Sequence, residues 1–348
     1  MESFKSLKGA CNRKTMGFTE PSIVALFKTL NISFLEEVLS EVYSKKKRRP
    51  PHSPVAMLKA LIFQKIRQIP SWRKLANTLK TEPTWLQVLG LKKAPCHSSF
   101  SVFTKRMGPK LFQKVFHIIR EQLKPCLSSL GKRIAIDSTI VKGYVNPRRH
   151  GLGGSVSDPD ARWGVTGQIV NKPIHVFGYK LQIACDADIG LPLVYTVASA
   201  NKSDMKLFRD TLLKSKESGN LAEVVIADAG YDSKRNILLA LKYHAIPIIK
   251  LNPRGTKKTY RRADYLLPVP RDSIEWKRYY SLRVAIERIF SRLKLELGLE
   301  HLKLRRFERV EVHFVTSLIA MVAIALAAVA NGYGQLALCI EPWRYFGQ

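Results

Sequence analysis

The chain has 348 residues, which is long enough for two domains. Hydrophobic residues make up 46% of it and charged residues 24%, and this ordinary balance excludes wholesale disorder and a multi-span membrane protein. The 58 Lys and Arg against 27 Asp and Glu give a net charge of +31. This charge favours a polyanionic partner, with nucleic acid first and an acidic membrane surface second.

The basic excess is unevenly distributed along the chain. Residues 1–130 carry 24 basic and 7 acidic side chains, residues 131–230 carry 13 and 10, and residues 231–348 carry 21 and 10. Because residues 131–230 are nearly neutral, we predict that a site built from acidic side chains lies in this middle segment. The two basic flanking segments are predicted to bind a polyanion. A merely solvated basic surface is the alternative.

The cysteines and the apolar segments indicate in which cellular compartment the protein is expected. The five cysteines form no CxxC pair and have no His at zinc-finger spacing, which indicates a reducing compartment without structural zinc. The polar first residues contain no secretory signal, so we expect a cytoplasmic protein. Residues 312–340 lack Lys, Arg, Asp and Glu and are long enough to cross a bilayer. Polar interruptions favour a buried core helix there, and we expect no membrane partner.

The first 125 residues have a helical pattern and are predicted to form a smaller all-helical N-terminal domain at 1–125, followed by a linker at 126–132. Ser71 is typical of a helix start. Arg73 and Lys74 follow it, where a helix-turn-helix-like domain would contact DNA. A dimerisation bundle fits the same pattern equally well.

The middle of the chain changes to short apolar runs rich in β-branched residues. The predicted elements are strands at 133–141, 179–184 and 193–198, a helix at 201–215, a strand at 223–228, a helix at 232–244 and a strand at 245–251. This β-β-β-α-β-α-β order is that of the ribonuclease H-like fold, a mixed sheet with flanking helices in the α/β class. We place this catalytic domain at 133–330 and a C-terminal tail at 331–348.

A basic insertion is predicted within this domain at about 252–276. It is rich in Pro and Gly, and its basic side chains are interleaved with Tyr260, which is typical of a clamp on DNA backbone phosphates. A solvated loop is the alternative. The basic residues of the expected clamp are Arg254, Lys257, Lys258, Arg261 and Arg262.

Residues 277–297 contain neither Gly nor Pro and repeat apolar residues at helical spacing, so we predict one continuous helix. At about 100° per residue, Tyr280, Arg283, Glu287 and Lys294 share an arc of about 60° beside the apolar face. Glu287 is therefore expected at the edge of the core. An exposed ladder of charges is the alternative.

Two aspartates occupy strand positions, where an isolated carboxylate is costly unless it is satisfied. Asp137 lies within IAIDST, and Asp228 ends VVIAD. Mg²⁺ prefers oxygen ligands, and two such ions about 3.5 to 4 Å apart promote in-line displacement at phosphorus. With Glu287, these aspartates form the predicted catalytic metal site. Six other aspartates, the first four in turn-like contexts, are alternative ligands: Asp158, Asp160, Asp186, Asp188, Asp204 and Asp232.

The spacing Tyr280-x2-Arg283-x3-Glu287-x6-Lys294 resembles the Y-R-E-K signature of DDE transposases of bacterial and archaeal insertion sequences. The phrases IAIDSTIV, FGYKLQIACDADIGLPL and VIADAGYDS look like those of the insertion sequence five group, in the insertion sequence four/five superfamily. PPHSPVAMLKALIF and SWRKLANTL resemble the N-terminal transposase domain of that group. The resemblance covers about residues 50–330.

This resemblance implies a site, a cofactor and partners. The implied catalytic, metal-binding triad is Asp137, Asp228 and Glu287, with two Mg²⁺ ions for which Mn²⁺ can substitute. The implied contacts to transposon-end DNA are Tyr280, Arg283 and Lys294. The implied activity is cleavage at terminal inverted repeats and strand transfer into target double-stranded DNA, by a homodimer in the DNA complex, in the prokaryotic cytoplasm at the nucleoid. A catalytically silent DNA-binding regulator, or a metal-dependent nuclease without strand transfer, is the alternative.

Overall fold

The computed structural model describes residues 22–42, 52–127, 129–146, 157–169, 172–252 and 264–345. The chain forms two compact units. The first, the helical unit, combines Met1–Pro125 with Arg292–Gln348, and the second, the sheet unit, is Cys126–Ser291. The helical unit is therefore built from two segments that are far apart in the sequence.

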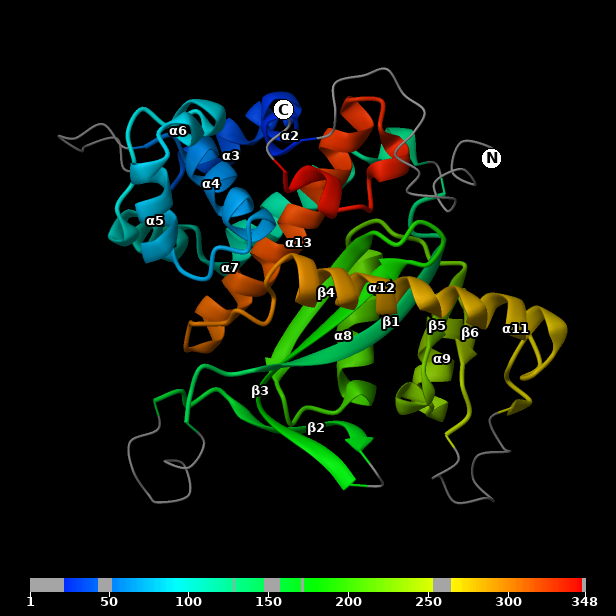
Figure 1. The fold of residues 1–348 in the computed structure, drawn as a ribbon. Coiled ribbons are helices and arrows are strands. Elements are labelled where there is room, and N and C mark those ends of the chain that lie inside the picture. The colour runs from blue at the N-terminus through cyan, green and yellow to red at the C-terminus, as the bar shows by residue number, and fades with distance from the viewer. Residues whose placement is uncertain are drawn as a thin grey trace. The chain divides into compact units, whose positions relative to one another are not determined.

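The described residues of the helical unit form helices and no strand (Figure 1). Ser71 caps α5 as expected, because its side chain accepts a hydrogen bond from the backbone N–H of Lys74 at 3.2 Å. Helix α7 is kinked at Gly108 and Pro109, since Pro109 has no N–H for the helical ladder. The helices before the sheet unit are α2 (Ile23–Thr29), η2 (Ser33–Leu35), α3 (Glu36–Ser40), α4 (Pro54–Ile66), α5 (Trp72–Thr81), α6 (Thr84–Leu89) and α7 (His97–Glu121), with η3 (Lys124–Cys126) after them.

Helix α13 (Phe307–Ala330) is the core helix of the helical unit. It is long and apolar enough to cross a membrane, but 83% of its most apolar stretch is buried, and it packs against α7, α4 and α2. The prediction of a buried core helix is thus confirmed. The π-helical turn η7 (Arg292–Glu296) precedes α13, and the short turns η8 (Gly334–Leu336) and η9 (Glu341–Trp343) follow it.

The last described residues are tied to the first helix. The backbone N–H of Ile23 donates to the carbonyl of Tyr345 at 2.9 Å, and Asn331 donates to the hydroxyl of Thr29 at 2.6 Å. Our sequence-based boundaries place residues 292–330 in the catalytic domain and residues 331–348 in a tail. In the structure, both of these segments belong to the same compact unit as the N-terminal helices.

Six strands form one mixed sheet in the sheet unit (Figure 1). The strand order is β2-β3-β1-β5-β6, with β4 also paired to β3. Strand β1 pairs with β3 antiparallel and with β5 parallel, and β5 pairs with β6 parallel. The predicted element order is confirmed, and β2 is an additional strand. The bounds are β1 (Arg133–Lys142), β2 (Arg162–Ile169), β3 (Lys172–Asp186), β4 (Pro192–Ser199), β5 (Val224–Ala227) and β6 (Ile246–Ile249).

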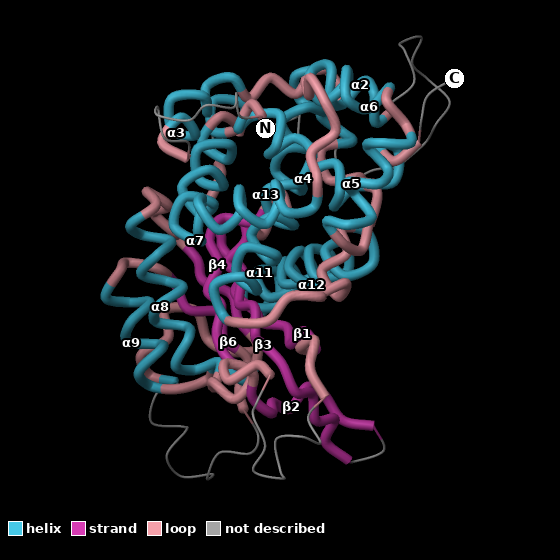
Figure 2. Tube along the Cα trace, turned by 90° about the vertical axis from the view of Figure 1, so that its left-hand side faces the viewer, coloured by secondary structure: helices cyan, strands magenta, loops and turns pink. Residues whose placement is uncertain are grey.

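Strand β3 is longer than predicted because its first half pairs with β2. The two strands form a ribbon that extends past the other strands (Figures 1 and 2). The second half of β3 lies between β1 and β4, from Tyr179 onward.

Helices cover both faces of the sheet (Figures 1 and 2). Helices α8 (Asp204–Glu217) and α9 (Lys234–Lys242) pack on one face, and α11 (Ile274–Tyr280) and α12 (Val284–Ser291) lie on the other. The 3-10 turns η5 (Ala229–Tyr231) and η6 (Ser281–Arg283) precede α9 and α12. The main core of this unit lies under α8 and α9 and includes Ile134, Ile136, Val225, Ala227, Phe208, Leu212 and Ile237.

The helix predicted over 277–297 is helical from 277 to 296, but it is not one regular α-helix. Helix α11 ends at Tyr280, a 3-10 turn follows, and α12 then gives way to the π-helical turn η7. At the first break the hydroxyl of Ser281 donates to the carbonyl of Arg278 at 2.8 Å, and such a local bond competes with the helical ladder. At the second, the N–H of Leu297 reaches the carbonyl of Arg292, five residues back.

Candidate active site

Asp137 and Asp228 lie side by side at the centre of the sheet. Strands β1 and β5 are parallel and their register pairs Ile136 with Ala227, so the next residue on each strand is one of the two aspartates. Ile136 and Ala227 belong to the core under α8 and α9. Because side chains alternate along a strand, Asp137 points to the opposite face, where α12 lies.

Backbone N–H groups hold one oxygen of each aspartate. The N–H of Ser138 donates to Asp137 Oδ1 at 2.8 Å. Asp228 precedes the turn η5, and its Oδ1 accepts from the N–H of Gly230 at 2.8 Å. Both side chains are half-buried. Strand geometry and local turns therefore fix the orientation of both carboxylates without a bound ligand.

Arg283 connects Asp137 to Glu287. Its Nη1 donates to Asp137 Oδ2 at 3.0 Å, and its Nη2 donates to Glu287 Oε1. The 3-10 turn places residues three apart over one another, and the guanidinium of Arg283 lies 5.9 Å from the ring centre of Tyr280. That ring stacks on Trp276 at 4.7 Å. The structure thus brings together Asp137, Glu287, Arg283 and Tyr280.

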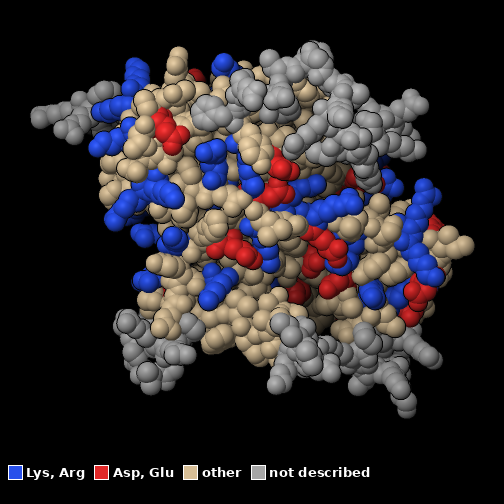
Figure 3. Space-filling view, in the orientation of Figure 1, with Lys and Arg blue, Asp and Glu red and all other residues tan. Residues whose placement is uncertain are grey.

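The ionised form of the two aspartates is disfavoured in the protein alone, in spite of the ion pair between Asp137 and Arg283. Burial, followed by the charge of Asp228, raises the pKa of Asp137 to about 7, against the opposing effect of Arg283. Burial also raises the pKa of Asp228, although the N–H of Gly230 opposes the change. Acidic side chains gather near α12 with basic ones beside them (Figure 3). A cation at this position would stabilise the ionised form of both carboxylates.

The donor chemistry fits a hard divalent cation, since the candidate ligands are all carboxylate oxygens. No group of three His, Cys, Asp or Glu side chains converges to metal-binding distances within the described residues. Asp137 and Asp228 are adjacent, but Glu287 is 53% exposed and held by Arg283. The two aspartates are therefore the preformed part of the site.

A second polar network, which the sequence did not predict, adjoins Asp137 through the next residue. Ser138 donates to Asp204 Oδ1 at 2.6 Å, and the buried Lys180 donates to the same oxygen at 2.8 Å. The charge of Asp204 contributes to the raised pKa of Asp137, after burial and Asp228. A lysine inside the apolar strand FGYKLQIA is the signal that would have revealed this network.

Four of the remaining alternative aspartates have structural partners: Asp158, Asp186, Asp188 and Asp232. Buried Asp186 accepts from the N–H groups of Gly131 and Ile189, both at 2.7 Å. Asp158 accepts from the hydroxyl of Tyr179 at 2.6 Å. The other pairs are Asp188 with Arg133 and Asp232 with Arg271, both at 2.7 Å.

The other predicted DNA contacts belong to the helical unit or lie outside the described residues. Lys294 belongs to the helical unit, where its Nζ lies 3.5 Å from Glu300. Arg73 and Lys74 are exposed in the first turn of α5. The residues of the expected phosphate clamp lie outside the described residues: Arg254, Lys257, Lys258, Arg261 and Arg262.

Comparison with known protein families identifies the class of protein to which this chain belongs. The family described as Transposase DDE domain matches residues 128–323, which is more than half of the chain and includes Asp137, Asp228 and Glu287. The chain belongs to this family and is a DNA transposase of the DDE class. A second family, described as Transposase domain (DUF772), matches residues 19–106 in the helical unit.

Several solved transposase structures are similar to the chain at low identity. The piggyBac transposase synaptic complex with hairpin DNA is 12% identical with a TM-score of 0.45, and the match covers 90% of this chain and 78% of that one. The Mos1 paired-end complex with the left transposon end is 12% identical with a TM-score of 0.21, covering 76% and 83%. The pre-cleavage Mos1 transpososome is 11% identical with a TM-score of 0.21, covering 76% and 83%. No curated protein matches the chain.

Proposed function

We propose that this protein is the transposase of a prokaryotic insertion sequence of the insertion sequence five group. It binds the terminal inverted repeats of its element, cleaves DNA at the ends and joins the freed 3′-hydroxyls to target DNA. The sheet unit is proposed to be a ribonuclease H-like catalytic domain. The observation that carries the proposal is the pair of adjacent carboxylates, Asp137 and Asp228, in a chain of this family, with Arg283 linking Asp137 to Glu287.

In the proposed mechanism, Asp137, Asp228 and Glu287 would hold Mg²⁺. When bound, two such ions supply the activation of the attacking water or 3′-hydroxyl and the stabilisation of the leaving oxygen. The N–H groups of Ser138 and Gly230 keep the two aspartates oriented, and cation binding keeps both ionised at neutral pH.

In this mechanism, Arg283 is proposed to exchange its carboxylate partners for a DNA phosphate. Its two N–H groups hold Asp137 and Glu287 in the protein alone, and a guanidinium fork binds phosphate equally well. We therefore expect a phosphate of the transposon end to replace the carboxylates on Arg283, with Tyr280 beside it and Lys294 as a further contact. The exchange would release Glu287 for the metal when DNA is present.

The DNA partners and the assembly follow from the reaction. Two transposon ends must be brought together, so the active complex is proposed to be a homodimer on double-stranded DNA. The basic surface over the helices α4 to α6 (Figure 3) supports DNA binding by the helical unit, including Arg73 and Lys74. A silent DNA-binding regulator needs no metal site, and a nuclease would cut without joining.

The test uses purified full-length protein, Mg²⁺ and a plasmid that carries both ends of the element. We expect cleaved and joined products with wild type, and none with Asp137→Asn, Asp228→Asn or Glu287→Gln, each of which should still bind the ends. Glu223→Gln, which changes an exposed carboxylate just before β5, is the matched control and should keep activity. Metal-dependent cleavage by all three variants would refute the site.

Two further outcomes separate the alternatives. Cleavage without joined products would support the nuclease. DNA binding without cleavage, together with no heat of Mg²⁺ binding by calorimetry, would support the regulator.

A further inference from the structure

A cavity of about 250 Å³ lies within the helical unit, and its lining is cationic. It is enclosed by α4, α5, α7, the segment before α13, and α13 itself. No Asp or Glu lines it in the part of the chain that the structure describes. Its ionisable side chains are Lys65 on α4, Arg73 on α5, His97 on α7, His301 and Lys303 before α13, and His313 on α13.

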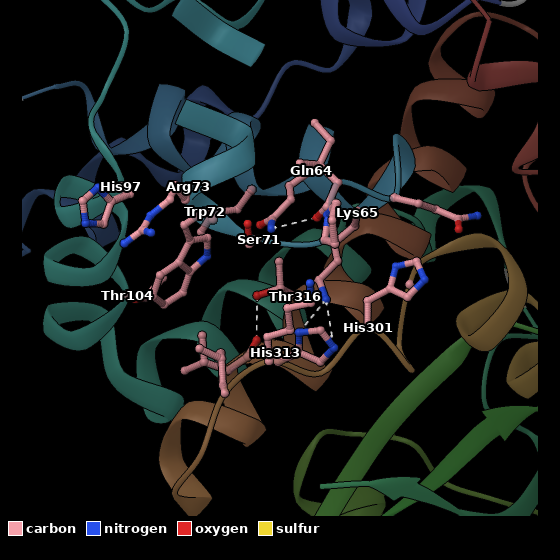
Figure 4. Close-up of a pocket in the computed structure, with 18 residues that line it drawn as sticks. Gln64, Lys65, Ser71, Trp72, Arg73, His97, Thr104, His301, His313 and Thr316 are labelled. Atoms are coloured by element: carbon pink, nitrogen blue, oxygen red, sulfur yellow. Dashed lines mark hydrogen bonds between the residues drawn. The ribbon is translucent and has the colours of Figure 1, made fainter. Parts of the chain in front are cut away.

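Lys65 reaches into this cavity from α4 toward His313, with Trp72 and Arg73 on one side and His301 on the other (Figure 4). Lys65 is 6% exposed. Its Nζ lies 3.0 Å from Nδ1 of His313, and Nε2 of the same ring lies 3.0 Å from the carbonyl of Leu299. Since a carbonyl only accepts, Nε2 carries the proton and Nδ1 accepts from Lys65.

Lys65 has no acidic partner among the residues that the structure describes. An ammonium has three N–H donors, and the imidazole of His313 accepts one of them. Burial lowers the pKa of Lys65 to about 7, which is the result of a buried cation without an anion. A bound anion would supply the missing partner.

The start of helix α5 adds a second anion-binding feature. Ser71, Trp72 and Arg73 all line the cavity, and they are the cap and first residues of a ten-residue helix. Unpaired N–H groups and the helix dipole at such a terminus favour anions, and phosphate groups in particular. The buried ammonium and this helix start therefore favour the same kind of ligand.

We infer that this cavity is a phosphate-binding site, separate in its residues from the carboxylate site of the sheet unit. Its volume falls below the roughly 300–1,000 Å³ of sites for drug-sized ligands, so it has room for a single phosphate group, while the rest of the molecule that carries this phosphate stays outside the cavity. The phosphate belongs either to DNA or to a soluble nucleotide or free phosphate. With DNA as the source, which rests on the proposed function, the site adds a specific phosphate contact to DNA binding by the helical unit.

The first test is calorimetric titration of the full-length protein with inorganic phosphate at pH 8 and constant ionic strength. We expect saturable binding by wild type and at least about tenfold weaker binding by Lys65→Met and by Arg73→Gln, since each removes a charged donor. Lys80→Gln removes a positive charge from the last turn of the same helix α5, outside the cavity, and should change binding less than about twofold.

Proton uptake on binding is a second readout. It distinguishes phosphate bound next to Lys65 from phosphate attracted by the net positive charge of the protein. Binding of phosphate should make wild type take up a proton at pH 8, because the anion restores the charge on Lys65, and Lys65→Met should take up none. Comparing heats in buffers of different ionisation enthalpy measures this uptake.

Competition identifies the source of the phosphate. Displacement of inorganic phosphate by a short duplex of transposon-end sequence would assign the site to DNA. Displacement by a deoxynucleoside monophosphate but not by the duplex would assign it to a soluble ligand. Absence of saturable phosphate binding, or equal binding by wild type and both cavity variants, would overturn the inference.

Discussion

Replacing Lys65 with Met should change how the stability of the protein depends on pH. Burial lowers the pKa of Lys65 in the folded protein to about 7, whereas the unfolded chain has the ordinary value of 10.5. Between these values the unfolded state binds a proton that the folded state does not, so the free energy of unfolding of wild type rises with pH. Below about pH 7 both states bind the proton, and the destabilisation by Lys65 is constant.

The magnitude follows from the width of this window. One proton of difference corresponds to about 1.4 kcal/mol per pH unit. Relative to Lys65→Met, wild type should therefore gain roughly 3 kcal/mol of unfolding free energy between pH 7 and pH 10. The pKa of neighbouring His313 is lowered well below its usual range, by burial first and then by the charge of Lys65, so its titration lies outside this window.

Urea unfolding followed by circular dichroism at 222 nm, in phosphate-free buffers from pH 7 to pH 10, measures the difference between the two proteins. Other groups titrate in both and cancel in the subtraction. Lys80→Met, which changes an exposed lysine of α5, is the control and should remain parallel to wild type. Parallel curves for wild type and Lys65→Met would show that Lys65 keeps its proton in the folded protein, and would refute the reasoning.

Two substitutions in the sheet unit test its packing and its second polar network. Gly178→Ala would place a Cβ 2.1 Å from a backbone oxygen of β1, and should cost about 2–4 kcal/mol in a urea titration. Gly143→Ala meets its nearest atom at 3.4 Å and should cost less than about 1 kcal/mol, so equal losses would contradict the close approach. Asp204→Asn leaves the buried Lys180 without its anion and should cost about 1–3 kcal/mol. Asp210→Asn, exposed on the same helix, is the comparison, and an equal loss there would show that the ion pair contributes nothing.

The strands of the sheet and the positions of its two aspartates could be predicted from the sequence, because they depend on local sequence patterns. Asp137 and Asp228 interrupt apolar runs that form central strands, and a carboxylate in such a run is conspicuous. Strand β2 was missed because it pairs only with β3 and packs little. Its Trp163 and Val165 are 51% and 55% exposed, and two glycines lie within it, so no burial pattern marks it.

The contacts of Arg283 could not be read from its spacing. A helical wheel places Arg283 near Glu287, but the bond to Asp137 depends on how α12 packs on β1, 146 residues away in the sequence. The 3-10 turn before α12 also changes the register that a continuous helix would have. The apolar character of α13 predicts burial but not the partner helices that bury it.

The discontinuous helical unit determines the order in which this protein can fold during synthesis. Helices α4 and α7 leave the ribosome early, yet α13, which covers them, is made only after the whole of Cys126–Ser291. At roughly 5–20 residues per second, this segment takes on the order of 10–30 s to translate. During that interval α13 is not yet available to pack against the apolar faces of α4 and α7. A chain that stops before Phe307 lacks α13 altogether. Premature termination in the second half of the gene would therefore leave the DUF772-matching region without its core helix and prone to aggregation or proteolysis.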